Sequence, residues 1–160
     1  MKLHEITPSD VTANNHKFAI VAARFNSAIV NNLLTGAITT LEKHGVTKDK
    51  IDIVYVPGAF ELPITAKELI NQHTYSAVIT LGCVIRGDTP HFDFVAGECA
   101  SGIMNVSLES SIPVIFGVLT TDNEAQAQAR SQLEGDNKGI DCALCALEMC
   151  NVLKSIRETS

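Results

Sequence analysis

Short apolar runs alternate along the chain with longer stretches in which apolar residues recur every three or four positions. The first pattern is typical of buried strands and the second of amphipathic helices. The predicted strands are 18–23, 51–56, 76–81 and 113–119, and the predicted helices are 27–44, 63–72, 91–110, 123–132 and 139–156. Alternating strands and helices favour right-handed crossovers. We therefore expect an α/β fold with a four-stranded parallel sheet and helices on both faces.

The third predicted strand leads into a polar turn, residues 82–90, that starts with Gly82 and ends immediately before His91. In open α/β sheets, ligands bind at the carboxyl ends of the strands, and backbone N–H groups at the start of the next helix suit an anion such as phosphate. The imidazole of a histidine in this position can donate and accept protons. This turn is the first candidate site.

The other predicted strands also lead into polar or aromatic residues. These are Arg24, Phe25 and Asn26 after the first strand, residues 57–61 after the second, and residues 117–121 around the end of the fourth. Further polar residues follow along the chain: Gln126 and Arg130 on a short helix, and residues 137–139 before the last helix. Parallel strands end at the same edge of a sheet. We therefore expect these residues to gather around one ligand site.

Length and charge narrow the class of protein. A chain of 160 residues with 46% hydrophobic content can close one sizeable core, which favours a single domain. The net charge of −6 comes from scattered acids, and no run of Lys or Arg offers a surface for nucleic acid. No stretch reaches the roughly 18 apolar residues of a membrane span, and the N-terminus lacks the apolar core of a signal peptide. We expect a cytoplasmic protein that binds neither nucleic acid nor membrane.

The cysteines are interpreted as packing residues. There are five, an odd number, on segments with a buried pattern, which indicates reduced thiols rather than a disulfide framework. Cys142 and Cys145 have the spacing of a redox motif, but they lie inside a predicted helix and lack a polar turn. A redox or zinc role for this pair is therefore not favoured.

Two predicted helices, 91–110 and 139–156, carry apolar residues on more than one side. Such a helix must be covered nearly all round, whereas a sheet face covers only one side of it. The excess apolar surface favours a homo-oligomer with closed symmetry. The alternative is tight packing between helices of one chain.

Six blocks of sequence carry a resemblance to a known family. They are Phe25 with Asn26; residues 56–63; Leu81 and Gly82 with residues 84–87, Thr89 and His91; residues 116–120; Gln126 with Arg130; and residues 137–139. In their order and spacing, the chain from about residue 17 to residue 156 resembles the 6,7-dimethyl-8-ribityllumazine synthases.

The resemblance implies a flavodoxin-like three-layer αβα sandwich, in which residues 1–160 form a single domain and the polar arm 1–16 contacts a neighbouring subunit. It implies the penultimate step of riboflavin biosynthesis, in which 5-amino-6-(D-ribitylamino)uracil condenses with 3,4-dihydroxy-2-butanone 4-phosphate and releases phosphate and water. Because the nucleophile belongs to a substrate, no cofactor and no metal are expected. The sequence has no clustered set of His, Cys and carboxylate ligands.

The resemblance also implies partners and roles for single residues. His91 matches the general acid and base. The residues matching the pyrimidine and ribityl site are Phe25, Ala59, Phe60, Glu61, Cys83, Val84, Ile85 and Phe116, and those matching the phosphate site are Asp88, Thr89, Arg130 and Lys138. The implied partners are these small molecules, further copies of the chain in pentamers whose sites are shared between adjacent subunits, and, as a functional link, riboflavin synthase. Phe116, Arg130 and Lys138 would reach into the pocket of a neighbour.

Each of these residues also has a structural interpretation. His91 and Glu61 could serve the start of a helix, the three phenylalanines could belong to the core, and Arg130 could be a solvated helix residue. Arg86 is expected to form a structural ion pair rather than to contact substrate.

Two positions depart from the family's common pattern. A carboxylate at Asp88 would repel phosphate unless its side chain turns away from the site. The composition of residues 131–136 leaves pentamer, decamer and hollow sixty-subunit shell all open.

Two other classes of function remain as alternatives. One is a non-catalytic module of the same fold that binds lumazine or flavin. The other is a Schiff-base aldolase, although no lysine lies at the carboxyl edge of a predicted strand.

Overall fold

A computed structural model of the chain describes residues 5–6 and 9–158. Its helices and strands, in chain order, are β1 (Phe18–Ala23), α1 (Ser27–Lys43), β2 (Ile51–Val56), α2 (Leu62–Gln72), β3 (Ala77–Ile85), α3 (His91–Ser110), β4 (Val114–Thr121), α4 (Glu124–Ala129) and α5 (Lys138–Glu158). Two short 3-10 turns, η1 (Lys48–Lys50) and η2 (Ala59–Glu61), precede β2 and α2. The first four residues of the predicted arm, and residues 7–8, lie outside the described residues.

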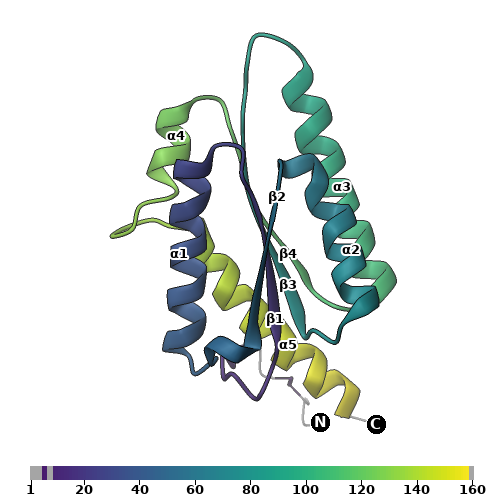
Figure 1. The fold of residues 1–160 in the computed structure, drawn as a ribbon. Helices are drawn as coiled ribbons and strands as arrows, with labels where there is room; N and C mark the ends of the chain where they lie inside the picture. The colour runs from purple at the N-terminus through teal and green to yellow at the C-terminus, as the bar shows by residue number, and fades with distance from the viewer. Residues whose placement is uncertain (1–4, 7–8, 159–160) are drawn as a thin grey trace.

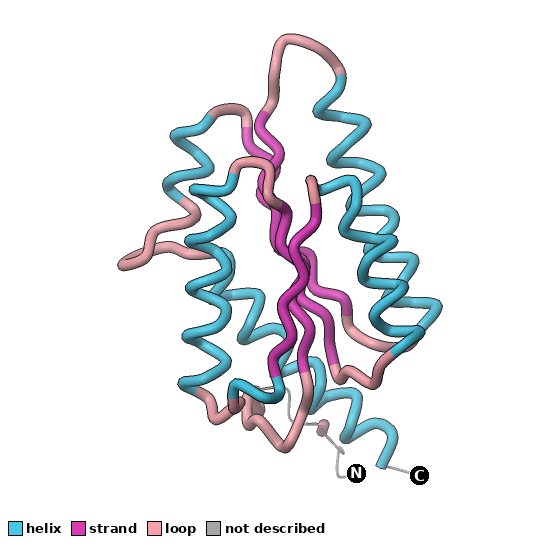
Figure 2. Tube along the Cα trace, in the orientation of Figure 1, coloured by secondary structure: helices cyan, strands magenta, loops and turns pink. Residues whose placement is uncertain are grey.

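The four strands form one parallel sheet in the order β2-β1-β3-β4. Helices α1, α4 and α5 cover one face of this sheet, and α2 and α3 cover the other (Figure 1). Figure 2 shows the strands as the middle of three layers. The predicted α/β class, the parallel sheet and the flavodoxin-like αβα sandwich are confirmed.

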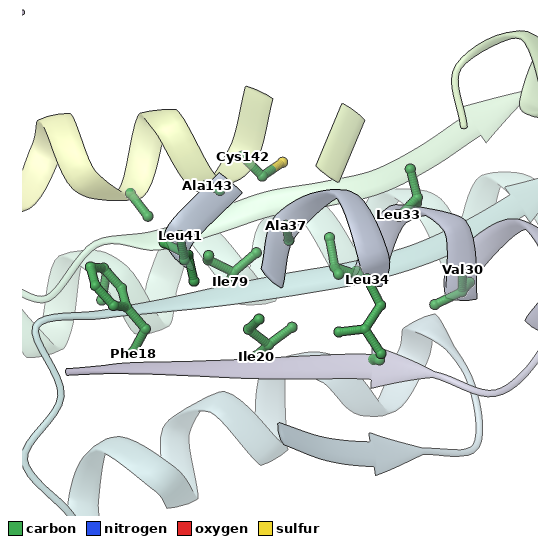
Figure 3. Close-up of a cluster of buried hydrophobic side chains, with 14 of the residues drawn as sticks. Phe18, Ile20, Val30, Leu33, Leu34, Ala37, Leu41, Ile79, Cys142 and Ala143 are labelled. Atoms are coloured by element: carbon green, nitrogen blue, oxygen red, sulfur yellow. The ribbon is translucent and has the colours of Figure 1, made fainter. Parts of the chain in front are cut away.

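The central strands are unbroken apolar runs in the sequence because helices bury both faces of the sheet. All six residues of β1 are buried, and their side chains alternate between the two faces. Phe18 and Ile20 join a cluster with Leu33 and Leu41 of α1 (Figure 3), whereas Val21 belongs to the cluster under α2 and α3. The sheet therefore has a separate hydrophobic core on each side.

The third strand is longer than predicted. The ladder between β3 and β4 continues to the pair Ile85 and Thr121, so Gly82 lies inside the strand and the turn begins only at Arg86. The prediction that the turn starts at Gly82 is wrong. A Cβ at Gly82 would approach Leu62 to 3.3 Å, so the glycine serves packing against α2 rather than chain reversal. The last three residues of the strand are thereby placed at the sheet edge.

The predicted helix 123–132 is also too long, because α4 ends at Ala129. The chain then forms a loop that is closed by a bridge between Ser131 and Asn137. The buried Asn137 side chain donates to the carbonyls of Asn32 and Gln132 and accepts from the Gly139 amide at 2.8 Å. This long-range network, which local periodicity does not report, ends one helix and starts the next.

The two strongly apolar helices differ in how the chain covers them. Helix α5 packs against α1 and the sheet and buries seven of its residues, among them Ala143 and Leu147, so packing within one chain accounts for much of its pattern. Helix α3 buries three residues and leaves Phe94, Met104 and Leu108 exposed. The excess apolar surface inferred from the sequence therefore lies chiefly on α3.

Replacing Gly139 with alanine should destabilise the fold. A Cβ at this position would overlap the backbone carbonyl of Leu33, where α5 meets α1. Overpacking against backbone costs roughly 1–3 kcal/mol, which urea unfolding of the Gly139→Ala variant should show as a lower midpoint. Cys145→Ala, a small change at an exposed position of the same helix, is the control and should stay within about 0.5 kcal/mol. Equal midpoints for both variants would contradict this account of the contact.

Candidate functional site

A cavity of about 740 Å³ opens at the carboxyl edge of the sheet. With the strand order β2-β1-β3-β4, the chain leaves β1 and β3 in opposite directions, and the crevice at such a switch point is where ligands bind in this type of fold. The lining residues are Phe25, 57–61, 83–85, Gly87, Thr89, His91, Phe92, Phe94 and Val95. Its volume lies in the range of small-molecule sites.

The last three residues of β3, Cys83, Val84 and Ile85, line the cavity. Burial raises the pKa of the Cys83 thiol to about 11, so this group is a neutral thiol at physiological pH. A protonated, buried thiol is a poor nucleophile. Cys83 therefore contributes shape and apolar surface to the cavity rather than covalent chemistry.

Two aromatic rings project into the cavity from neighbouring turns. Phe25 is 71% exposed and Phe60 is 56% exposed, and neither belongs to a core cluster, so the interpretation of these two as core residues is wrong. Exposed rings at a cavity mouth suit the stacking of a planar heterocycle.

Backbone and side-chain hydrogen bonds fix the turn that carries Phe25. The Phe25 amide donates to the carbonyl of Pro57 at 3.0 Å, which extends the contact between β1 and β2 beyond the strands. The next residue, Asn26, adopts a left-handed conformation with φ 60°, and its side-chain amide donates to the Cys83 carbonyl at 2.8 Å. Asparagine tolerates this conformation better than most residues. The backbone at Phe25 is thus held next to the end of β3.

Ala59 and Glu61 lie on the 3-10 turn η2, immediately before α2. The half-buried Glu61 lines the cavity, so its carboxylate is available to a ligand as well as to the helix start. A carboxylate accepts hydrogen bonds from hydroxyl groups, such as those of a polyol chain.

His91 is the first residue of α3 and lines the cavity together with Gly87 and Thr89. Its backbone amide donates to the Thr89 hydroxyl at 3.4 Å. Within the described part of the chain, the imidazole has no hydrogen-bond partner, so both ring nitrogens are free to exchange protons with a ligand. Asp88 is exposed and is not part of the lining.

Phe116, Arg130 and Lys138 lie outside the cavity of their own chain. Phe116 is on β4 and is partly exposed, while Arg130 and Lys138 are exposed at the two ends of the loop between α4 and α5. The Lys138 amide donates to the Arg130 carbonyl at 2.9 Å, and the Arg130 guanidinium donates to the Gln126 carbonyl at 2.9 Å. The structure thus separates the predicted site into two groups of residues.

Sequence reasoning did not include every lining residue. Phe92, Phe94 and Val95 form part of the wall, but their spacing was read only as the apolar side of a helix. Their place within about one turn of His91 is the signal that could have identified them. Arg86 does not line the cavity and forms ion pairs with Asp122 and Asp93, as expected.

Among the described residues, no three His, Cys, Asp or Glu side chains are grouped so that they could hold a metal ion. In the same part of the chain, no helix combines the length and the apolar character needed to cross a membrane.

Comparison with known proteins adds an independent line of argument. A family model described as 6,7-dimethyl-8-ribityllumazine synthase matches residues 15–154, a span that includes the cavity and the loop between α4 and α5. The chain is also similar to the 6,7-dimethyl-8-ribityllumazine synthases of two strains of Clostridium kluyveri. Each is 50% identical over 156 residues, which cover 98% of this chain and 99% of the relative. With this match and the αβα sandwich described above, the chain belongs to the 6,7-dimethyl-8-ribityllumazine synthase family.

Proposed function

We propose that the chain catalyses the condensation of 5-amino-6-(D-ribitylamino)uracil with 3,4-dihydroxy-2-butanone 4-phosphate to give 6,7-dimethyl-8-ribityllumazine, in riboflavin biosynthesis. Membership of the family supports this function. The observation that carries it in the structure is the cavity at the switch point of the sheet. It combines two exposed aromatic rings, a carboxylate and an imidazole that has no hydrogen-bond partner among the described residues.

The pyrimidine substrate fits the part of the cavity between β1 and α2. Its planar ring stacks on Phe25, and the ends of β3 and η2, with Ala59, Phe60 and Val84, enclose it. The hydroxyl groups of its ribityl chain donate to Glu61. These contacts orient the amine that attacks the ketone, and such orientation contributes several kcal/mol to the reduction of the barrier.

His91 moves protons during the reaction. The amine adds to the ketone and water leaves as the imine forms. Loss of a proton then expels phosphate, and the ring closes with the loss of a second water. Each step needs a general acid or base close to the reacting atoms, which is the role of the imidazole. Within the described chain no lysine lines the cavity, and Lys138 of an adjacent subunit is assigned to the phosphate, so no lysine is assigned to a Schiff base with substrate.

The phosphate group fits the turn before α3. Gly87, Thr89 and His91 line the cavity at this turn, and a helix start together with a hydroxyl group suits an anion. Asp88 is outside the lining, so its carboxylate is not directed at the phosphate, and only its backbone would contribute. Arg130 and Lys138 of an adjacent subunit supply the positive charge, and its Phe116 completes the pyrimidine site.

We propose that these shared sites form in homo-oligomers built on pentamers. The exposed apolar residues of α3, among them Phe94, Met104 and Leu108, supply surface that another subunit can cover. Pentamer, decamer and sixty-subunit shell are all compatible with the described residues. Contact of the arm 1–16 with a neighbour is part of this proposal. The segment from Asp10 to His16 also packs on its own α5 through the buried Asn151.

The cellular setting belongs to the same proposal. A phosphorylated substrate is charged and does not cross membranes unaided, which favours a cytoplasmic location. The lumazine product supports a functional link to riboflavin synthase. The 160 residues act as a single domain.

The first test follows lumazine absorbance and fluorescence when the purified protein is mixed with both substrates and no metal. The wild type should form the product, and His91→Ala should lower kcat by roughly 10²–10⁴-fold, less if the uncatalysed condensation is fast. His73→Ala removes an exposed histidine after α2 and should leave kcat unchanged. Unchanged turnover in His91→Ala would contradict the role of His91, and binding without turnover in the wild type would favour the non-catalytic module.

Arg130→Ala should weaken binding of the phosphate-bearing substrate and of inorganic phosphate, because the bidentate guanidinium contact is lost. Affinity for the pyrimidine substrate should change little. Isothermal titration and KM values for each substrate provide the measurement, and Arg157→Ala, at another exposed arginine, is the control. An equal loss of affinity for both substrates would place Arg130 elsewhere.

Shared sites predict complementation between two inactive variants. When His91→Ala and Arg130→Ala chains are refolded together, some pockets combine an intact histidine from one chain with an intact arginine from the other. Activity should then exceed that of either variant refolded alone. If mixed oligomers of native mass form without regaining activity, the site does not lie between subunits.

A further inference from the structure

The imidazole of His91 depends on its surroundings for its position, because it has no polar partner of its own in the described structure. It follows a turn, residues 86–90, that leaves the sheet after β3 and contains Gly87. Among the described residues, the one hydrogen bond between His91 and a side chain is the long bond from its backbone amide to the Thr89 hydroxyl, at 3.4 Å. Phe92 and Val95 pack the start of α3 on the core, and the position of the turn before it depends on polar contacts made by other residues.

Arg86 makes three contacts that close this turn. Its Nε donates to Asp122 Oδ1 at 3.1 Å, and its Nη1 donates to Asp93 Oδ1 at 3.3 Å. Its guanidinium also lies over the ring of Phe92, with 4.3 Å between the guanidinium carbon and the ring centroid. Phe92 and Asp93 are the two residues that directly follow His91, so Arg86 holds the first turn of α3 from the base of the loop.

The backbone of Arg86 and its partner Asp122 are anchored at the end of the sheet. The Arg86 amide donates to the Thr121 carbonyl at 2.8 Å, at the last rung between β3 and β4. Asp122 follows directly, and its own amide donates to the Gln126 side chain at 2.8 Å. Asn123 caps α4 by accepting from the Gln126 amide. The carboxylate that receives Arg86 thus belongs to a turn with little freedom to move.

We propose that Arg86 is a positioning residue for His91, which acts by fixing Phe92 and Asp93 to the end of β4. This inference rests on the proposed function, because His91 must be the group that exchanges protons. Arg86 itself does not line the cavity, so it is not placed to contact the substrate directly. Its effect reaches the reaction only through the placement of the imidazole.

A positioning role and a contribution to folding stability predict different effects of losing Arg86. The side chains of Arg86, Asp93 and Asp122 are 46%, 63% and 70% exposed, and ion pairs at such positions add little to global stability. Displacement of a catalytic group by about 1 Å, in contrast, can lower turnover by about 10²-fold. Loss of Arg86 should therefore reduce kcat while leaving the unfolding midpoint almost unchanged.

The experiment measures kcat and both KM values for Arg86→Met and Arg86→Lys, each in the wild-type chain and in the His91→Ala chain. Methionine keeps an unbranched side chain over Phe92 but removes both charged hydrogen bonds. Lysine keeps the charge but cannot reproduce the planar fork. Lys154→Met is the matched control, because it removes an exposed ion pair, with Glu158, far from the turn in sequence.

In the wild-type chain, Arg86→Met should lower kcat at least about tenfold, with KM for the pyrimidine substrate within about twofold. Arg86→Lys should fall between Arg86→Met and the wild type, and Lys154→Met should behave as the wild type. In the His91→Ala chain, Arg86→Met should cause no further loss, because the group that it positions is already absent.

Two results would overturn the inference: an unchanged kcat in Arg86→Met, or an equal loss with and without His91. If Arg86→Met does not fold or assemble, Arg86→Lys decides by the same comparison. Failure of the proposed function is a separate result, because then the wild type itself forms no lumazine. In that case the positioning role of Arg86 is contradicted together with the proposed function.

Discussion

Burial of β1 and β3 on both faces is the constraint on which the rest of the structure depends. Apolar side chains that alternate above and below the sheet require a layer of helices on each side, which gives three layers. Because α1 connects β1 to β2 on one face and α3 connects β3 to β4 on the other, the chain leaves β1 and β3 in different directions at the carboxyl edge. The cavity occupies the space between these exits. Core packing thus determines where the site lies, and the lining residues determine which chemistry it can support.

Local pattern was sufficient where an apolar run of regular period is flanked by turn residues. The bounds of β1, β2 and α3 agree with the sequence-based ranges, because the apolar period and the flanking turn residues carry all the information needed there. The pattern failed at Gly82, which looks like a turn residue but packs against Leu62, and after Ala129, where Asn137 reaches back to α1. Both failures arise from contacts between residues far apart in sequence.

For the candidate site, too, some residues could be predicted from the local pattern and others could not. Residues that directly follow a strand, such as Phe25, Glu61 and His91, meet at the cavity because the topology brings strand ends together. Arg130 and Lys138 do not line the cavity of their own chain, and the sequence pattern does not indicate whether they contribute to the site of another subunit. The contacts of Arg86 with Asp93 and Asp122 were foreseen only as an ion pair, since the sequence does not show that one guanidinium spans two elements.

The contact between α1 and α5 has a consequence for the order in which the chain can complete its core during synthesis. The face covered by α2 and α3 has all its elements once about 121 residues have emerged. The opposite face must wait for Gly139 to pack on Leu33 and for Ala143 and Leu147 to follow, close to the end of the chain. Until then Ile20 and Ile79 lack part of their cover. A nascent or truncated chain without α5 therefore presents the part of this face formed by β3 and β4 to the solvent and to chaperones.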